Sequence, residues 1–158
     1  MFLRANLPHA YLSGDCVECM ACSDNVVRAG LTPKFMDVPT LCSMLDYTPK
    51  SATANKFTEE RSVEDFINMY SKSFSDNDGI KTFNPDVPDF SLQQISYPAG
   101  TRVLPPVESA SITILVSGKA KINDQSVEAG LVFYQSSNES LELHIEEDIV
   151  AYRAFVQA

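Results

Sequence analysis

A closely spaced series of short apolar segments, separated by turn residues, fills the last part of this 158-residue chain. The segments lie between Phe90 and Val156, and within most of them apolar residues alternate with polar ones. About five or six short strands at such a spacing are typical of an antiparallel sandwich or a small barrel. The sequence therefore predicts a mainly β fold, an antiparallel jelly roll or β-sandwich, with one or two short helices.

The clearest alternation in this region is that of Ile112, Ile114 and Val116. Successive side chains of a strand point to opposite faces, so we expect these three to share the inner face. We expect Gly118 to turn the chain into Ala120 and Ile122. Further strands are expected at residues 90–95, 130–134, 141–145 and 149–156.

The chain divides into three regions by composition. Residues 1–47 begin inside an apolar run, residues 48–88 are rich in polar residues and proline, and residues 89–158 carry the strand pattern. We expect the middle region to be a linker with at most one helix, at 62–73, where apolar residues repeat at helical spacing.

Two local elements are expected in the first region. Cys16–Cys22 reads as the returning strand of a hairpin, because the turn signal Ser13-Gly14-Asp15 precedes it. Residues 39–47 are expected to form a short helix with Leu41 and Leu45 on one face.

The four cysteines, Cys16, Cys19, Cys22 and Cys42, also lie in the first region. On the expected strand Cys16 and Cys22 share a face while Cys19 points the other way, so the three do not converge easily on one metal. We expect reduced thiols that pack in a buried environment, with a metal or redox role as the alternative.

The charge balance disfavours one class of partner. The chain has 21 acidic and 12 basic side chains, a formal net charge of −9, and no run of lysine or arginine. Binding to a phosphate backbone needs clustered positive charge, so we expect no nucleic-acid partner. No apolar stretch has the length of a membrane span and no secretory signal is present, so we expect a cytoplasmic protein with no membrane partner.

Only two histidines are available for metal binding or acid–base chemistry, His9 and His144. His144 alternates with Glu142 and Glu146 on a strand, opposite apolar residues, which predicts an exposed side chain. His9 lies in an apolar context, where a hydrogen-bonded structural histidine and a metal ligand are equally compatible with the sequence.

The segment from Phe2 to Phe35, with the runs PHAY at residues 8–11 and DNVVRAG at residues 24–30, resembles a known family. It is similar to type I mannose-6-phosphate isomerase (phosphomannose isomerase), a zinc enzyme of the cupin superfamily. The resemblance implies a cupin-like fold in two parts. Residues 1–47 would end the catalytic zinc domain, and residues 89–158 would form a cupin-like β domain without metal ligands.

The resemblance also implies roles for individual residues. The family holds zinc with a glutamine, a histidine and a glutamate from its earlier half and with the histidine of a Pro-His-Ala-Tyr segment, which is His9 here. Arg28 matches the active-site arginine, and Tyr11 and Asp24 resemble residues that line the substrate pocket. Glu18 is our candidate for handling a proton, because apolar neighbours on its expected strand face would raise its pKa. A structural pairing of Glu18 with Arg28 or with a backbone donor is the alternative.

The implied reaction interconverts mannose 6-phosphate and fructose 6-phosphate by moving a proton between C1 and C2 through a cis-enediol. Zinc and a fixed guanidinium would stabilise the negative charge that the oxygens of this intermediate gain. Because one zinc ligand is present and the proteins of the family are longer, we expect a C-terminal portion that needs the missing N-terminal half and is inactive alone. A non-catalytic, cupin-like binding or interaction module is the alternative function.

Overall fold

The structure, a computed structural model, describes residues 1–22, 26–51, 61–62, 79–85 and 87–156. The chain divides into two units, Met1–Thr58 and Glu59–Ala158. Every buried core residue in the described ranges belongs to the second unit. No helix in these ranges is long and apolar enough to cross a membrane.

The first unit contains one helix in its described part, α1 (Val38–Met44). Asp37 caps this helix, since its Oδ1 accepts a hydrogen bond from the Thr40 backbone N–H at 3.2 Å and its Oδ2 accepts one from the Thr40 hydroxyl at 2.7 Å. Leu41 and Leu45 are half-buried. The short helix expected at 39–47 is therefore confirmed, with slightly different ends.

The hairpin expected around Cys16–Cys22 is not formed, so this prediction was wrong. A strand needs a partner for its backbone N–H and C=O groups, and the described residues of the first unit contain no strand that could pair with it. The expected burial of the thiols was also wrong: Cys16, Cys22 and Cys42 are exposed, and Cys19 is half-buried. Partial burial raises the pKa of the Cys19 thiol.

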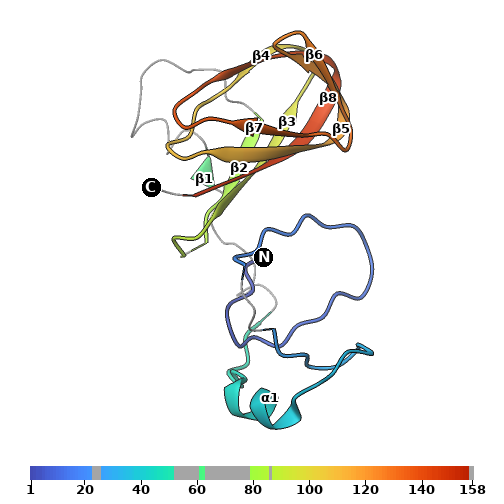
Figure 1. Ribbon diagram of the computed structural model, residues 1–158, viewed down its shortest axis with the longest axis vertical. Helices are drawn as coiled ribbons and strands as arrows, with labels where there is room; N and C mark the ends of the chain where they lie inside the picture. The colour runs from blue at the N-terminus through green and yellow to red at the C-terminus, as the bar shows by residue number, and fades with distance from the viewer. Residues whose placement is uncertain (23–25, 52–60, 63–78, 86, 157–158) are drawn as a thin grey trace. The chain divides into compact units, whose positions relative to one another are not determined.

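The second unit is built from antiparallel strands, labelled in Figure 1. They are β1 (Arg61–Ser62), β2 (Ile80–Phe83), β3 (Ser91–Tyr97), β4 (Gly100–Leu104), β5 (Ser111–Ile122), β6 (Gln125–Glu128), β7 (Val132–Gln135) and β8 (Leu141–Phe155). This confirms the mainly β, antiparallel fold class. The helix considered at 62–73 lies outside the described residues except for Ser62, which belongs to β1, and β2 lies in the region expected to be a linker.

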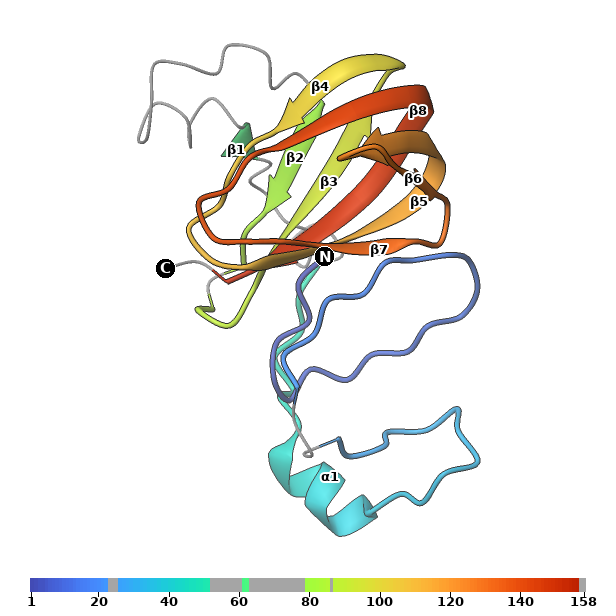
Figure 2. The same cartoon turned by 45° about the horizontal axis from the view of Figure 1, so that its top comes forward.

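The two longest strands, β5 and β8, take part in both layers of the fold, which Figure 2 shows curling around a common interior. Residues 111–115 of β5 pair with residues 151–155 of β8, between β7 and β3. Residues 119–122 of β5 pair with residues 143–147 of β8, between β6 and β4. Bending two long strands in this way closes the sheet into a sandwich around one core. The strands expected at 141–145 and 149–156 are thus one bent strand.

The bend of β5 lies at Gly118, which has φ +85°. The register between β5 and β8 shifts on both sides of this residue, as in a β-bulge. A Cβ atom at position 118 would overlap the backbone carbonyl of Asp148. The turn expected at Gly118, into Ala120 and Ile122, is observed as a bend within β5, because the glycine lets the strand change direction and continue to Ile122.

The faces of β5 are the reverse of those predicted. Ile112, Ile114 and Val116 point outward, with 57%, 38% and 47% of their surface exposed. The buried positions are instead held by their neighbours Ser111, Thr113 and Leu115. A shift of one residue exchanges the two faces of a strand, and here the pairing with β8 fixes which face is inside.

The interior of the second unit has an apolar part and a polar part. The apolar part is a cluster of 13 buried residues, all of which lie on β2–β6 and β8. They are Ile80, Ile95, Tyr97, Leu104, Leu115, Ala120, Ile122, Val127, Leu141, Leu143, Ile145, Ile149 and Ala151. The polar part surrounds Arg153 and includes Gln93, Thr113 and Gln135, all buried. Burial of the apolar cluster is the main stabilising term of this unit.

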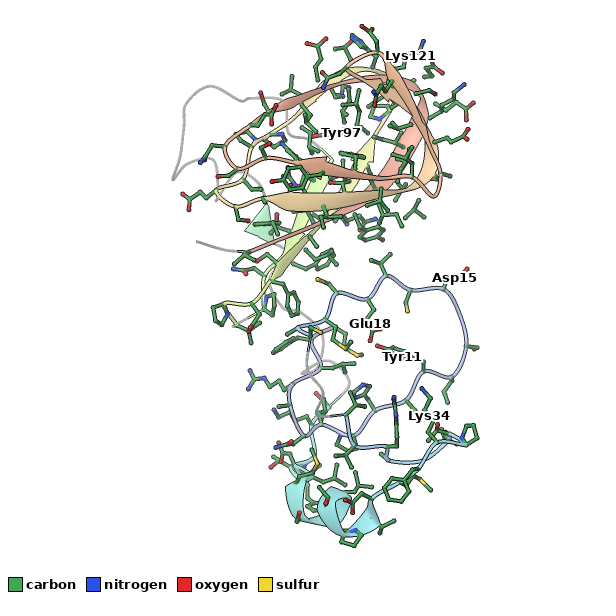
Figure 3. The ribbon with its side chains drawn as sticks, in the orientation of Figure 1. Tyr11, Asp15, Glu18, Lys34, Tyr97 and Lys121 are labelled. Atoms are coloured by element: carbon green, nitrogen blue, oxygen red, sulfur yellow. The ribbon has the colours of Figure 1, made fainter. Side chains whose placement is uncertain are left out.

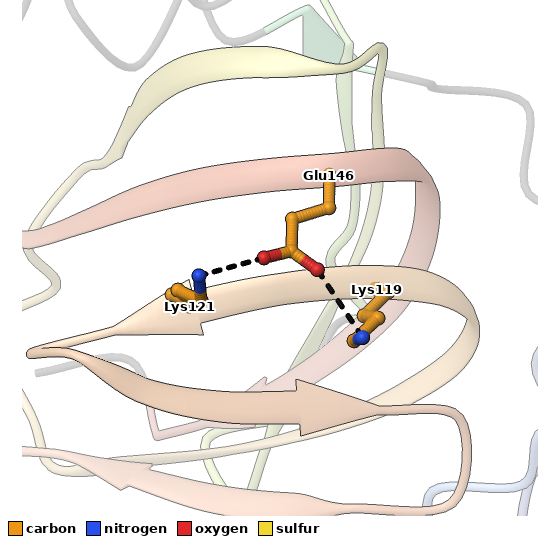
Figure 4. A network of polar contacts seen from close by, with 3 residues as sticks. All are labelled: Lys119, Lys121 and Glu146. Carbon is orange, nitrogen blue, oxygen red and sulfur yellow. Dashed lines mark ion pairs between the residues drawn. The ribbon is translucent and has the colours of Figure 1, made fainter.

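An ion-pair network on the outer surface joins β5 to β8 (Figure 4). Glu146 accepts from Lys121 Nζ at 2.9 Å and from Lys119 Nζ at 3.3 Å. These contacts raise the pKa of Lys121 and lower that of Glu146. All three side chains are exposed, so salt screens their attraction and the network adds little to stability.

Candidate active-site segment

His9 lies in an irregular part of the first unit with its side chain exposed. Its Nδ1 atom is 2.8 Å from the carbonyl oxygen of Leu7. When Nδ1 carries the proton and donates to this oxygen, Nε2 has a free lone pair. Histidines that bind metals commonly use one ring nitrogen as ligand and donate from the other to a backbone carbonyl. The geometry of His9 therefore suits a single metal ligand through Nε2.

Tyr11 and Glu18 are joined by a hydrogen bond, and Figure 3 shows their side chains pointing toward each other. The Tyr11 hydroxyl donates to Glu18 Oε1 at 2.7 Å. The Tyr11 ring also stands edge-on to His9, with 6.2 Å between the ring centroids and 74° between the planes. The hydrogen bond to Glu18, helped by slight burial, raises the pKa of Tyr11 to about 12. The hydroxyl therefore keeps its proton at neutral pH and acts as a donor.

Glu18 differs from its expected setting. It is exposed and lies on no strand, so the apolar strand face predicted around it is absent. Neither expected structural partner of Glu18, Arg28 or a backbone donor, is seen in the described part of the chain, and the observed partner is Tyr11.

Arg28 and Asp24 are the two remaining candidates. Arg28 is half-buried, and none of the hydrogen bonds found among the described residues joins it to His9, Tyr11 or Glu18. Asp24 lies outside the described residues. The structure thus brings together three of the five predicted site residues.

The described residues hold no group of three or more histidine, cysteine, aspartate or glutamate side chains that could bind a metal. A zinc site needs three or four protein ligands. His9 fits one position of such a site, but the described ranges do not supply the rest.

His144 is exposed, as predicted. Its Nε2 is 3.1 Å from Glu142 Oε1, and its Nδ1 is 3.2 Å from the Thr101 hydroxyl. These surface contacts belong to β4 and β8 of the second unit.

Sequence reasoning missed one buried polar group, which consists of Arg153, Gln93 and Gln135 in the second unit. Arg153 stands in the run AYRAF at an alternate position with Ala151 and Phe155. The alternation shows that Arg153 shares a face with Ala151 and Phe155. It does not show that this face points inward until the pairing of β8 with its neighbours is known. The local sequence alone carries no such signal.

Comparison with known proteins links this fold and this segment to one family. Residues 83–123 match the model of the C-terminal part of type I phosphomannose isomerase. Mannose-6-phosphate isomerase from Bos taurus is 43% identical over 166 aligned positions, which cover 98% of this chain and 36% of the relative. The enzyme of the same name from Homo sapiens is 44% identical with the same coverage. That from Candida albicans is 37% identical over 100% of this chain and 37% of its own length. The chain thus spans little more than a third of these relatives.

Solved structures confirm the fold class. Mannose 6-phosphate isomerase from Salmonella typhimurium, in a crystal structure bound to its substrate and to zinc, matches with a TM-score of 0.63. The match covers 85% of this chain and 31% of that protein at 21% identity. A zinc-bound form of mannose 6-phosphate isomerase matches with the same TM-score. At this level of identity the likeness shows a shared, cupin-like fold.

Proposed function

Because the chain belongs to the type I mannose-6-phosphate isomerase family and matches its C-terminal part, we propose that it is one portion of a zinc-dependent aldose–ketose isomerase. The reaction interconverts mannose 6-phosphate and fructose 6-phosphate. The observation that carries this proposal is the 43% identity to the Bos taurus enzyme across 98% of the chain. The proposal keeps the cytoplasmic location expected from the sequence.

In this proposal the first unit is the end of a catalytic domain that residues outside this chain complete. Large apolar side chains such as Leu12, Leu31 and Phe35 are exposed in the first unit, and its described residues include no buried one. Exposed apolar surface of this kind marks a region that another part of the protein covers. The 36% coverage of the relatives is consistent with this arrangement.

The residues of the first unit have separate roles in the proposed reaction. His9 supplies one zinc ligand through Nε2, and bound zinc would polarise the oxygens of the substrate as a Lewis acid. Glu18 carries the proton between C1 and C2, and Tyr11 holds its carboxylate through the 2.7 Å hydrogen bond. Arg28 stabilises the negative charge of the enediol intermediate, and Asp24 lines the substrate pocket. The described residues lack a complete zinc site, so no step of this scheme is assigned to the metal.

Solved variants of a structural neighbour support the choice of His9 and Glu18. Crystal structures of the Salmonella typhimurium enzyme include an alanine replacement of one histidine and another of a glutamate nine positions later. His9 and Glu18 have the same separation and order in this chain.

The second unit is a cupin-like domain without metal ligands in this proposal. Its described histidine, His144, is exposed and interacts with Glu142 and Thr101, and its interior is filled by the apolar cluster and the Arg153 group. It therefore contributes to the fold of the enzyme rather than to its chemistry.

The first test uses the 158-residue chain alone. We expect negligible turnover of mannose 6-phosphate in a coupled assay that follows glucose 6-phosphate, and far less than one zinc per chain after dialysis. Measurable turnover would contradict the proposed need for other residues. Stoichiometric zinc without turnover would favour the alternative, a binding module.

The second test uses a whole-length enzyme that contains this segment. His9→Ala should lose both zinc and activity, since it removes a ligand. His144→Ala is the matched control and should keep both, because its side chain is exposed in the second unit. Equal effects of the two substitutions would contradict the assignment of roles.

A further inference from the structure

The outer face of β5 changes from apolar to charged along the strand. Before the bend its outward residues are Ile112, Ile114 and Val116, whereas after the bend Lys119 and Lys121 form the ion-pair network with β8. The two parts of one strand thus present different chemistry to the outside of the sandwich.

Strand β8 changes in the same way. The part that pairs with the charged end of β5 carries Glu142 and Glu146 on its outer face. The part that pairs with the apolar end carries Tyr152, opposite Ile114, and Ala154, opposite Ile112. The apolar ends of β5 and β8 therefore lie side by side.

Strand β7 extends this apolar surface on the other side of β5. Tyr134 lies opposite Ile112 and Val132 lies opposite Ile114, and these two side chains are 63% and 55% exposed. We call Ile112, Ile114, Val116, Val132 and Tyr134 the β5–β7 face. It is continuous across two paired strands and contains no charged residue.

The composition of the β5–β7 face is that of an interface. Each of its five side chains is at least 38% exposed, so the described residues leave the face open. Soluble proteins rarely expose a contiguous apolar patch without a partner, and the centres of protein interfaces are poor in charged residues and enriched in tyrosine. The charged end of the same sandwich has the composition of a surface that faces water.

The length of the relatives indicates what covers this face. The match to the Bos taurus enzyme covers 36% of that protein, so nearly two thirds of its length has no counterpart in this chain. A partner in the same polypeptide has a high effective concentration. A second copy is less favoured, because each chain carries a formal net charge of −9 and like charges repel.

We propose that the β5–β7 face is the surface on which the N-terminal portion of the same polypeptide docks, through an apolar surface of its own. The proposal rests on the proposed function in one respect, namely that this chain is one portion of a longer enzyme. The second unit would then hold the catalytic portion by hydrophobic contact while its charged end stays in water.

Hydroxyl-radical labelling with mass spectrometry measures how exposed individual side chains are. It is applied to the 158-residue chain and to a whole-length protein that contains it. We expect labelling of Tyr134 to fall by about fivefold or more in the whole-length protein, because the centre of an interface is buried. His144 is the internal control and should be labelled equally in both proteins, since it is exposed at the charged end. Equal labelling of Tyr134 in both proteins would overturn the proposal.

The oligomeric state of the whole-length protein is measured by light scattering in the same samples. We expect the monomer to show the protection of Tyr134. Protection in a dimer but not in the monomer would assign the face to a second copy and would overturn the proposal.

A matched pair of valine variants tests the face by stability. Val132 on β7 and Val103 on β4 are both exposed valines of the second unit, but Val103 lies opposite Glu142 at the charged end. In the 158-residue chain, both lysine variants should melt within about 2 °C of the parent, as exposed substitutions do.

The two variants should separate in the whole-length protein. Val132→Lys should lower its melting temperature by roughly 4 °C or more, because docking would bury an unpaired charge. Val103→Lys should stay within about 2 °C of the parent. An equal effect of Val132→Lys in the chain and in the whole-length protein would mean that this position matters only within the second unit, and would overturn the proposal.

The docking proposal and the proposed function fail separately. A whole-length protein that protects Tyr134 but does not turn over mannose 6-phosphate would support docking and contradict the proposed function. A whole-length protein that turns over the substrate while Tyr134 is labelled as in the 158-residue chain would support the function and overturn docking.

Discussion

Gly118 allows the sharpest test of the folded structure, because the bend of β5 depends on it. Its φ is +85°, and a Cβ atom there would overlap the Asp148 carbonyl oxygen and lie 2.8 Å from the carbonyl carbon. Gly118→Ala therefore combines backbone strain with a collision against the backbone of β8. Gly130 is the matched control, since its φ is +92° but a Cβ there would meet no atom within 4 Å.

The two substitutions should differ by the cost of the collision. Holding an L-residue in the left-handed region costs roughly 1–2 kcal/mol, and this applies to both alanines. Forcing an extra group into a packed backbone adds about 1–3 kcal/mol, which applies to Gly118→Ala alone. We therefore expect a loss of roughly 2–5 kcal/mol for Gly118→Ala and of roughly 1–2 kcal/mol for Gly130→Ala.

Urea unfolding of the 158-residue chain measures this difference. With a slope of about 1–3 kcal/mol per molar urea, a loss of about 3 kcal/mol lowers the midpoint by about 1 M or more. The slope itself should not change, because both variants fold to the same sandwich. Equal midpoints for the two alanine variants would refute the close approach of Gly118 to Asp148.

Two further predictions concern tyrosines. An unfolded tyrosine loses its proton near pH 10, whereas Tyr97 keeps it to about pH 12, so the parent should lose about 1 kcal/mol of stability relative to Tyr97→Phe between pH 10 and 11. Urea unfolding at both pH values checks this, and a pH-independent difference between the two proteins would show that Tyr97 is not buried as described. In a whole-length enzyme, Tyr11→Phe should lower kcat by about tenfold with zinc content unchanged, the effect of losing one hydrogen bond to a charged group. Unaltered kcat would mean that Tyr11 does not position Glu18.

The sequence predicted correctly those features that depend on residues close together in the chain. The helix α1 follows a capping residue, Asp37, whose side chain binds the Thr40 N–H, and its apolar residues repeat at helical spacing. The exposed position of His144 follows in the same way from the charged residues that alternate with it. The antiparallel β class was predictable from the density of short strands.

Side-chain orientation in β5 was not predictable, because this strand has apolar residues at both alternate positions. Ile112 and Ile114 favour one face and Leu115 the other, so composition does not decide. The decisive contact is distant in sequence: Thr113 lies opposite Arg153. The buried Arg153 group was missed for the same reason.

For the segment Cys16–Cys22, the neighbouring residues predicted a strand that the structure does not contain. A turn signal precedes it, as in a hairpin, but strand formation depends on pairing with another strand, and the described residues of the first unit contain none. The contact between Tyr11 and Glu18 was not anticipated, since it joins side chains seven positions apart across irregular chain.

The central claim is that the first unit supplies catalytic groups to an isomerase, and Arg28→Lys in a whole-length enzyme tests it most directly. Lysine keeps the charge but not the planar guanidinium, so a positioned contact with the enediol would be lost. The measurement is kcat together with melting temperature and bound zinc in one preparation. We predict bound zinc unchanged, melting within a few degrees of the parent, and kcat lower by about a hundredfold or more. Unchanged kcat with a lowered melting temperature would make Arg28 a structural residue and contradict the claim.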